Sequence, residues 1–273
     1  MKHILKRYGF LLLLLICIGS LAGCGTNKES SGESSSTAVE PTEESTPQKI
    51  IVGTDTSYMP FEYLDEKTGE YVGFDIDLLK AITEQAGIEY ELKPMDFNGI
   101  IPALQTQNLD MAIAGITIKD ERKEVIDFSR GYYNAGTSIL VRADEKNING
   151  VEDLKGKVIA TKQGTASFDY ATKIEGVGKV VPFPNIDQAY MELEKGSADA
   201  VVFDSPNVLY YIKTAGEGKV KTVGGLLEGQ EFGIAFPKGS ELTDKIDAAL
   251  SAVMENGTYD ELYKKWFGEE PAQ

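Results

Sequence analysis

The sequence predicts an α/β fold with two similar lobes. Over residues 49–273, short β-rich runs alternate with segments of helical periodicity, which favours mainly parallel strands joined by helices. A weak internal repeat points to two lobes, because residues 108–114 and 197–203 each lead a helix through an aspartate into a buried strand. The ordinary helix-to-strand turn of any α/β protein gives the same pattern, so that second explanation stays open.

The first half of this region should contain three strands and two helices. Apolar side chains at helical spacing begin at Phe74 and end before Gly87. Two acids, Asp75 and Asp77, fall in the first turn of this helix, where the helix dipole favours negative charge. A second helix is expected around residues 100–104. The strands are expected at residues 50–52, 88–92 and 111–114.

The alternation begins again near residue 137. Strands are expected at residues 137–141, 158–161, 180–181 and 200–203, and helices at residues 168–174, 189–193 and 208–212. After residue 236 the chain ends in two amphipathic helices, whose aromatic side chains include Tyr259 and Trp266. We expect these aromatics to pack in the core and not to contact a ligand.

The N-terminal residues 1–23 have the features of a signal peptide. A positively charged start is followed by an apolar stretch at residues 10–18, which is shorter than the roughly 20 residues that a membrane span needs. The stretch ends in LAGC at residues 21–24, which resembles a bacterial lipobox, so Cys24 is the expected lipidation site. A plain secretory signal with a coincidental cysteine is the alternative.

Residues 24–48 should comprise the lipidated Cys24 followed by a disordered linker. This segment is rich in Ser, Thr, Glu and Pro and has too few apolar side chains to build a core. Two acyl chains on Cys24 would give stable anchoring. We therefore expect the folded part of the chain to lie at the extracytoplasmic face of the bacterial cell membrane, held there by lipid.

The composition excludes several classes of function. The 43 acidic residues outnumber the 27 basic ones, so the chain has no surplus of positive charge for nucleic acid or for anionic lipid headgroups. The one histidine, His3, and one of the two cysteines, Cys17, lie in the expected signal peptide. The mature protein should therefore have no disulfide, no histidine-dependent catalysis, no imidazole metal site and no cofactor.

Motifs spread over about residues 49–270 resemble those of the periplasmic amino-acid-binding proteins, the bacterial extracellular solute-binding proteins of family 3. They are DTSYMPFE from residue 55, GFDID from 73, MDFNGIIPAL from 95, GITIKDER from 115, GTAS from 164, NGTY from 256 and KKWFG from 264. Within that family, FPNIDQAYMEL at residues 183–193 is most similar to the glutamine-binding members.

This resemblance implies a type II periplasmic-binding-protein fold, in which a ligand is enclosed between two α/β lobes by hinge closure. Lobe 1 would comprise residues 49–131 and 233–273, and lobe 2 residues 137–227. The two hinge crossovers would lie at residues 132–136 and 228–232. The implied function is that of a monomeric substrate-binding lipoprotein, not an enzyme, which delivers a polar amino acid, L-glutamine, to the permease and ATPase subunits of an ABC importer.

The resemblance also implies a site for an amino-acid zwitterion. Arg122 would hold the α-carboxylate with its planar fork of donors, at the start of a helix whose backbone N–H groups also favour an anion. Asp204 would receive the α-ammonium, and Asp55 and Lys162 would accept from and donate to a side-chain amide. The full set of implied ligand-binding residues is Asp55, Tyr58, Phe97, Gly115, Ile116, Thr117, Arg122, Lys162, Thr165, Ala166, Phe203 and Asp204.

One departure from the glutamine-binding pattern affects specificity. Phe203 stands where those members have a histidine before the pocket aspartate, so contacts to the ligand side chain can differ. Glutamate, asparagine and arginine are therefore alternative ligands. A secreted dehydratase of the same fold is a further alternative, which would need acids and bases from Asp, Glu, Lys or Tyr. A ligand-sensing ectodomain is another alternative class of protein, which would require a membrane span and a signalling domain on the same chain.

Overall fold

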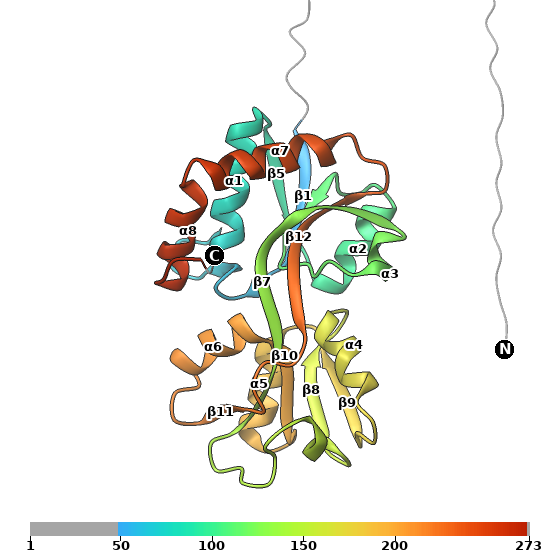
Figure 1. The fold of residues 1–273 in the computed structure, drawn as a ribbon, viewed down its shortest axis with the longest axis vertical. Coiled ribbons are helices and arrows are strands. Elements are labelled where there is room, and N and C mark those ends of the chain that lie inside the picture. Colours follow the sequence, from blue (N-terminus) through green and yellow to red (C-terminus); the bar gives the residue numbers. More distant parts are fainter. Residues whose placement is uncertain (1–48, 272–273) are drawn as a thin grey trace, which may run out of the picture. The chain divides into compact units, whose positions relative to one another are not determined.

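The computed structural model describes residues 49–271, and these residues form two α/β lobes linked by two long strands (Figure 1). The two-lobed α/β prediction is confirmed. The expected signal peptide, the lipidation site Cys24 and the linker lie outside the described residues.

Each lobe has its own helices and strands. The linking strands are β7 (Ile126–Arg142) and β12 (Gly229–Pro237). Lobe 1 contains β1 (Ile50–Thr54), β2 (Ser57–Tyr58), β3 (Glu62–Asp65), β4 (Glu70–Val72), α1 (Phe74–Ala86), β5 (Tyr90–Pro94), α2 (Phe97–Gln105), β6 (Met111–Ala112), α3 (Asp120–Lys123), α7 (Leu242–Glu255) and α8 (Thr258–Phe267). Lobe 2 contains a 3-10 turn (Val151–Leu154), β8 (Val158–Lys162), α4 (Ala166–Lys173), β9 (Lys179–Phe183), α5 (Ile186–Lys195), β10 (Ala200–Asp204), α6 (Ser205–Lys213) and β11 (Val220–Val223).

The main strands follow the order β5-β1-β6-β12-β7-β10-β8-β9, and β11 also pairs with β7. In lobe 1, β1 lies parallel between β5 and β6, and in lobe 2, β8 lies parallel between β9 and β10. The strands β7 and β12 run antiparallel to each other and to their other neighbours. The expectation of mainly parallel pairing therefore holds for β5-β1-β6 and for β10-β8-β9, but not for the linking strands or the small antiparallel sheet β2-β3-β4.

The internal repeat proposed from the sequence corresponds to matching structure in the two lobes. Asp110 accepts a hydrogen bond from the Ile51 N–H at 2.7 Å, and its own N–H donates to the Ile51 carbonyl at 2.9 Å. Asp199 makes the same two bonds with Val158, both at 2.8 Å. Each aspartate thus fixes the start of the strand that follows it against the first strand of its lobe.

The helix α1 forms as the sequence predicts. Its apolar stripe is fully buried, and the helix ends where Gly87 adopts the left-handed conformation at φ 62°. The aromatic side chains of the C-terminal helix pack against the main core as expected: Tyr259, Tyr263, Trp266 and Phe267. Among residues 49–271, no helix has the length and apolar character that crossing a bilayer requires.

Several elements differ from the expectation. The strand expected at residues 137–141 is part of the 17-residue β7, and the strand expected at 111–114 ends at Ala112. The small sheet β2-β3-β4 has no counterpart among the predicted elements. In β7 the polar residues Asp127, Arg130 and Asn134 interrupt the apolar pattern, because these positions lie at the surface or between the lobes.

Candidate ligand-binding site

One cavity lies where the two lobes meet, and most of the predicted site residues surround it. Its volume is about 10 Å³, far below the roughly 300–1,000 Å³ of small-molecule sites, so a ligand can enter only if the walls move apart. The lining residues are Asp55, Tyr58, Phe97, Ala114, Gly115, Thr117, Lys162, Thr165, Ala166, Phe203 and Asp204. All of these except Ala114 were predicted from the sequence, whereas the predicted residues Ile116 and Arg122 do not line the cavity.

A buried ion pair joins the lobes at one end of the cavity. Asp55 directly follows β1 and Lys162 ends β8, so the two side chains come from the carboxyl ends of the first strand of each lobe. Their charged groups contact each other, and each side chain is 1% exposed. Since both charges are desolvated, each depends on the other or on a polar ligand group for compensation.

A second buried carboxylate, Asp204, lies at the end of β10. It accepts hydrogen bonds from the Tyr58 hydroxyl at 3.0 Å and from the Ser167 hydroxyl at 2.6 Å. Burial raises the pKa of Asp204, and these two hydrogen bonds oppose that rise. Ser167 was not among the predicted site residues, although its position in the GTAS motif could have indicated it.

Arg122 is buried beside the cavity and donates to backbone carbonyls from both lobes. Its guanidinium bonds the Thr117 carbonyl at 2.9 Å and the Gly164 carbonyl at 3.1 Å, and the side chain is 8% exposed. Burial lowers its pKa. Within residues 49–271, no carboxylate forms an ion pair with Arg122. Both cationic groups approach the Phe97 ring, with Arg122 Cζ 5.8 Å and Lys162 Nζ 5.9 Å from its centre.

The helix expected to assist Arg122 is too short for that role. Helix α3 has only four residues, so its dipole is small. The eight-residue helix α4 of lobe 2 begins two residues after Gly164, beside the Arg122 guanidinium. Its N-cap, Thr165, accepts from the Phe168 N–H at 3.1 Å.

Two predicted site residues, Ile116 and Phe203, have apolar side chains that pack against other residues and form no hydrogen bonds. The Ile116 side chain is fully buried in the core of lobe 1, and its carbonyl accepts from the Gly233 N–H at 3.0 Å. Phe203 lines the cavity with its ring 5.8 Å from that of Tyr58, in an edge-on arrangement. Phe203 therefore supplies packing at this position and no hydrogen bond.

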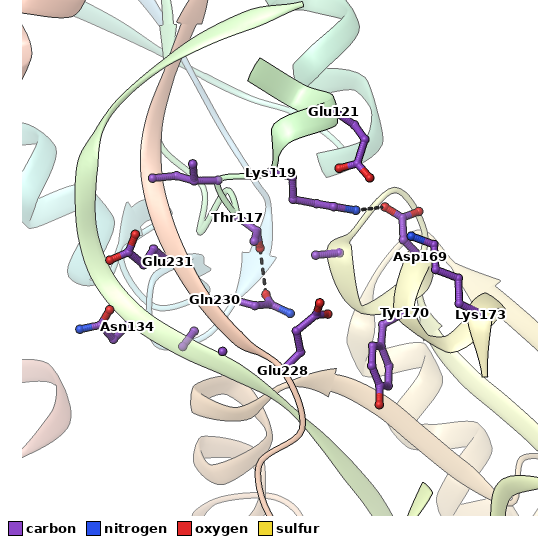
Figure 2. A pocket seen from close by; sticks show the side chains of 14 residues that line it. Thr117, Lys119, Glu121, Asn134, Asp169, Tyr170, Lys173, Glu228, Gln230 and Glu231 are labelled. Atoms are coloured by element: carbon purple, nitrogen blue, oxygen red, sulfur yellow. Dashed lines mark hydrogen bonds and ion pairs between the residues drawn. The ribbon is translucent and has the colours of Figure 1, made fainter. Parts of the chain in front are cut away.

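A wider polar cleft borders the cavity (Figure 2). Thr117 and Ala166 line both spaces, and in the cleft the Thr117 hydroxyl donates to the Gln230 side-chain oxygen at 2.9 Å. Figure 2 also shows Lys119 of lobe 1 reaching Asp169 of α4 at 2.7 Å. This half-exposed ion pair joins the lobes at the surface, as the Asp55–Lys162 pair does inside.

The family of the chain follows from its similarity to known proteins. A family model described as bacterial extracellular solute-binding proteins, family 3, matches residues 50–269. The chain belongs to this family. The match covers both lobes and the linking strands, in agreement with the motif resemblance. Within the described residues, no group of His, Cys, Asp and Glu side chains is arranged to hold a metal ion.

Several known proteins resemble the chain over most of its length. The ABC transporter glutamine-binding protein GlnH of Bacillus subtilis (strain 168) is 35% identical, with 98% of this chain and 99% of that protein covered. The arginine-binding extracellular protein ArtP of the same strain is 34% identical, with 94% and 96% covered. An ancestral arginine-binding protein, solved with arginine and with glutamine, is 46% identical, with a TM-score of 0.77 and 81% and 98% covered.

Proposed function

We propose that this family member captures free L-glutamine between its lobes and delivers it to the permease and ATPase of an ABC importer. The observation that carries the proposal is a set of four buried charged residues, three of which line the cavity while the fourth, Arg122, lies beside it. Arg122 and Lys162 are cationic, and Asp55 and Asp204 are anionic. Because these charges balance, a zwitterion with an uncharged polar side chain can bind without leaving any charge unpaired.

Each end of glutamine has suitable partners. The α-carboxylate takes the two Arg122 donors that now bond backbone carbonyls, close to the start of α4. The α-ammonium donates to Asp204, to the Gly115 carbonyl and to the Thr117 hydroxyl oxygen. The side-chain amide then inserts between Asp55 and Lys162, which supply an acceptor and a donor.

Opening and closing would occur at the two linking strands. The proposed hinges at residues 132–136 and 228–232 face each other, since Tyr133 pairs with Phe232 and Gly136 with Gly229. The pairing of β12 with β7 shifts register directly after Phe232. A β-bulge at such a position interrupts the regular strand, so we expect the strand to bend there. We place the lobe boundaries at the limits of these hinges.

Arginine is the second candidate ligand. Two of the similar proteins bind arginine, and one of these was also solved with glutamine. A guanidinium could bond Asp55, but it would place a positive charge beside the buried Lys162 ammonium. This charge conflict favours glutamine, because a like charge in a desolvated site is destabilising.

Calorimetric titration with the twenty amino acids tests the proposal. The protein should first be unfolded and refolded so that no ligand remains from expression. We expect glutamine to bind most tightly. Arginine as the tightest ligand would overturn the glutamine assignment but retain amino-acid binding, and turnover of a prephenate-like acid would instead support the dehydratase alternative.

A separate prediction concerns the membrane anchor. If Cys24 receives the lipid, Cys24→Ala should release the protein into the medium or leave it as an unprocessed precursor. Membrane fractionation and the mass of the N-terminal peptide would measure both outcomes, with Cys17→Ala as the matched control that should stay anchored. A processed Cys24→Ala protein that remained in the membrane would contradict lipid anchoring.

A further inference from the structure

Two carboxyl groups, Glu62 and Asp75, meet inside lobe 1, in a place that none of the proposed ligand contacts uses. Glu62 is the first residue of β3, and Asp75 lies in the first turn of α1. Both residues are 0% exposed, and the Asp75 carboxyl group is close enough to Glu62 to raise the pKa of that glutamate. Two acids at this depth need an explanation, since a buried charge without a partner is strongly unfavourable.

The fold forces the two side chains together. The start of α1 packs directly on the chain before β3, because the Phe74 N–H bonds the Pro60 carbonyl at 3.0 Å and the Asp75 N–H bonds the Phe61 carbonyl at 2.9 Å. Gly73 allows this approach. A side chain there would place its Cβ 2.0 Å from the Phe61 oxygen, and the φ of 139° is also one that glycine favours.

The hydrogen bonds around the pair account for only one of its four oxygens. Asp75 Oδ2 accepts from the Tyr132 hydroxyl at 2.7 Å and from the Gly115 N–H at 2.9 Å. Asp75 Oδ1 and both oxygens of Glu62 have no donor among the described residues. A proton placed between the two carboxyl groups would satisfy Asp75 Oδ1 and one Glu62 oxygen at once.

We propose that Glu62 and Asp75 share one proton, carried by Glu62, and that this acid pair positions the Gly115 turn of the ligand site. Asp75 is the ionised partner because two donors and the N-terminus of α1 stabilise its charge, whereas Glu62 has neither. Glu62 and Asp75 are therefore positioning residues. The proton sharing does not depend on the ligand, but the effect on affinity rests on the proposed function of Gly115.

The surroundings of the pair agree with a retained proton. Burial raises the pKa of Asp75 to about 6 and raises the pKa of Glu62 well above its usual range, with the Asp75 charge adding to the effect on Glu62. Among the neighbouring titratable groups only Lys162 favours ionisation of Glu62, and Lys162 already pairs with Asp55. The charged or titratable groups facing the pair are Tyr58, Tyr132, Tyr259, Asp55 and Lys162.

The pair should make the protein sensitive to alkaline pH. A carboxyl whose pKa is raised in the folded state contributes stability that is fully present below its unfolded pKa and is lost as the pH rises through the folded pKa. Loss of the shared proton also leaves two adjacent buried charges, which would displace Asp75 from the Gly115 N–H. Wild-type stability and glutamine affinity should therefore both fall as the pH rises above about 6 and through the raised pKa of Glu62.

Carbon-13 NMR of ligand-free protein with labelled glutamate side chains tests the shared proton directly. The Glu62 signal, assigned by its absence in Glu62→Gln, should titrate at a higher pH than all other glutamates. A Glu62 signal that titrates with the exposed glutamates would overturn the proposal, and this result would leave the ligand assignment untouched.

Variants test the positioning role. Glu62→Gln keeps a donor toward Asp75 but cannot ionise, so its affinity for glutamine should stay within about threefold of wild type at pH 6 and should no longer fall toward pH 9. Its urea midpoint should also lose the alkaline decline. The matched control Glu70→Gln, at an exposed position of β4, should keep the wild-type pH dependence. An unchanged decline in Glu62→Gln would show that another group causes it.

Discussion

Arg122→Ala should abolish measurable amino-acid binding while leaving the protein folded. The side chain is 8% exposed and forms no ion pair with a carboxylate among residues 49–271, so the ligand carboxylate would be its only directly bonded anion. Removing one member of such a desolvated, hydrogen-bonded charge pair costs about 2–5 kcal/mol, which corresponds to a loss in affinity of at least about 30-fold. Calorimetric titration with the tightest ligand measures the loss.

Two further variants test whether Arg122 binds the ligand carboxylate or affects affinity only through the stability of the protein. Arg122→Lys keeps the charge but loses the bidentate fork, and we expect its affinity to lie between those of wild type and Arg122→Ala. Arg130→Ala is the control, because Arg130 is exposed and pairs with Asp247 on the surface of lobe 1. Wild-type affinity in Arg122→Ala would show that this arginine supports the backbone only.

The wild type should prefer glutamine to glutamate by up to about 10⁴-fold. A glutamine amide satisfies both Asp55 and Lys162, whereas a glutamate carboxylate can bond Lys162 but meets the Asp55 charge at close range. A site built around polar partners rejects a mismatched analogue much more strongly than it rejects a ligand one methylene shorter. Asparagine should therefore bind better than glutamate in parallel titrations.

Asp55→Asn should reduce this preference by at least about tenfold. The new amide can rotate to donate to the glutamate carboxylate, and the repulsive charge is gone. Asp187→Asn is the matched control, since Asp187 also acts on Lys162 electrostatically but does not line the cavity. If Asp55→Asn leaves the ratio of the two affinities unchanged, Asp55 does not bind the side-chain amide.

The sequence predicts those elements whose pattern is local. Helix α1 has a continuous apolar stripe and a terminating glycine, so both its face and its end follow from the chain itself. Strand β7 does not, because the part before residue 137 depends on antiparallel pairing with β12, about a hundred residues later. The strands of the β2-β3-β4 sheet are too short to show the alternation of apolar and polar side chains that identifies a strand.

The residues of the candidate site were predictable where they belong to a family motif. They were less predictable where the packing of the fold determines whether a side chain faces the cavity. Ile116 was expected at the site but is fully buried in the core of lobe 1, whereas its neighbours Gly115 and Thr117 line the cavity. Ser167 belongs to the GTAS motif but was missed, because the motif alone does not show its bond to the distant Asp204. Asp75 looks like an ordinary acid of a first helical turn, and only the packing of α1 on the chain before β3 buries it.

The route of the chain through the lobes also decides the order in which they can be completed during translation. Lobe 2 consists of one continuous stretch, whose last strand, β11, ends at Val223. Lobe 1 needs β12, where Ala235 pairs with Ala112, and it needs α7 against α1. The ribosome must therefore deliver nearly the whole chain before lobe 1 can close its sheet. Lobe 2 can fold earlier, so a nascent chain exposes the unfinished edge of lobe 1 for longer than any surface of lobe 2.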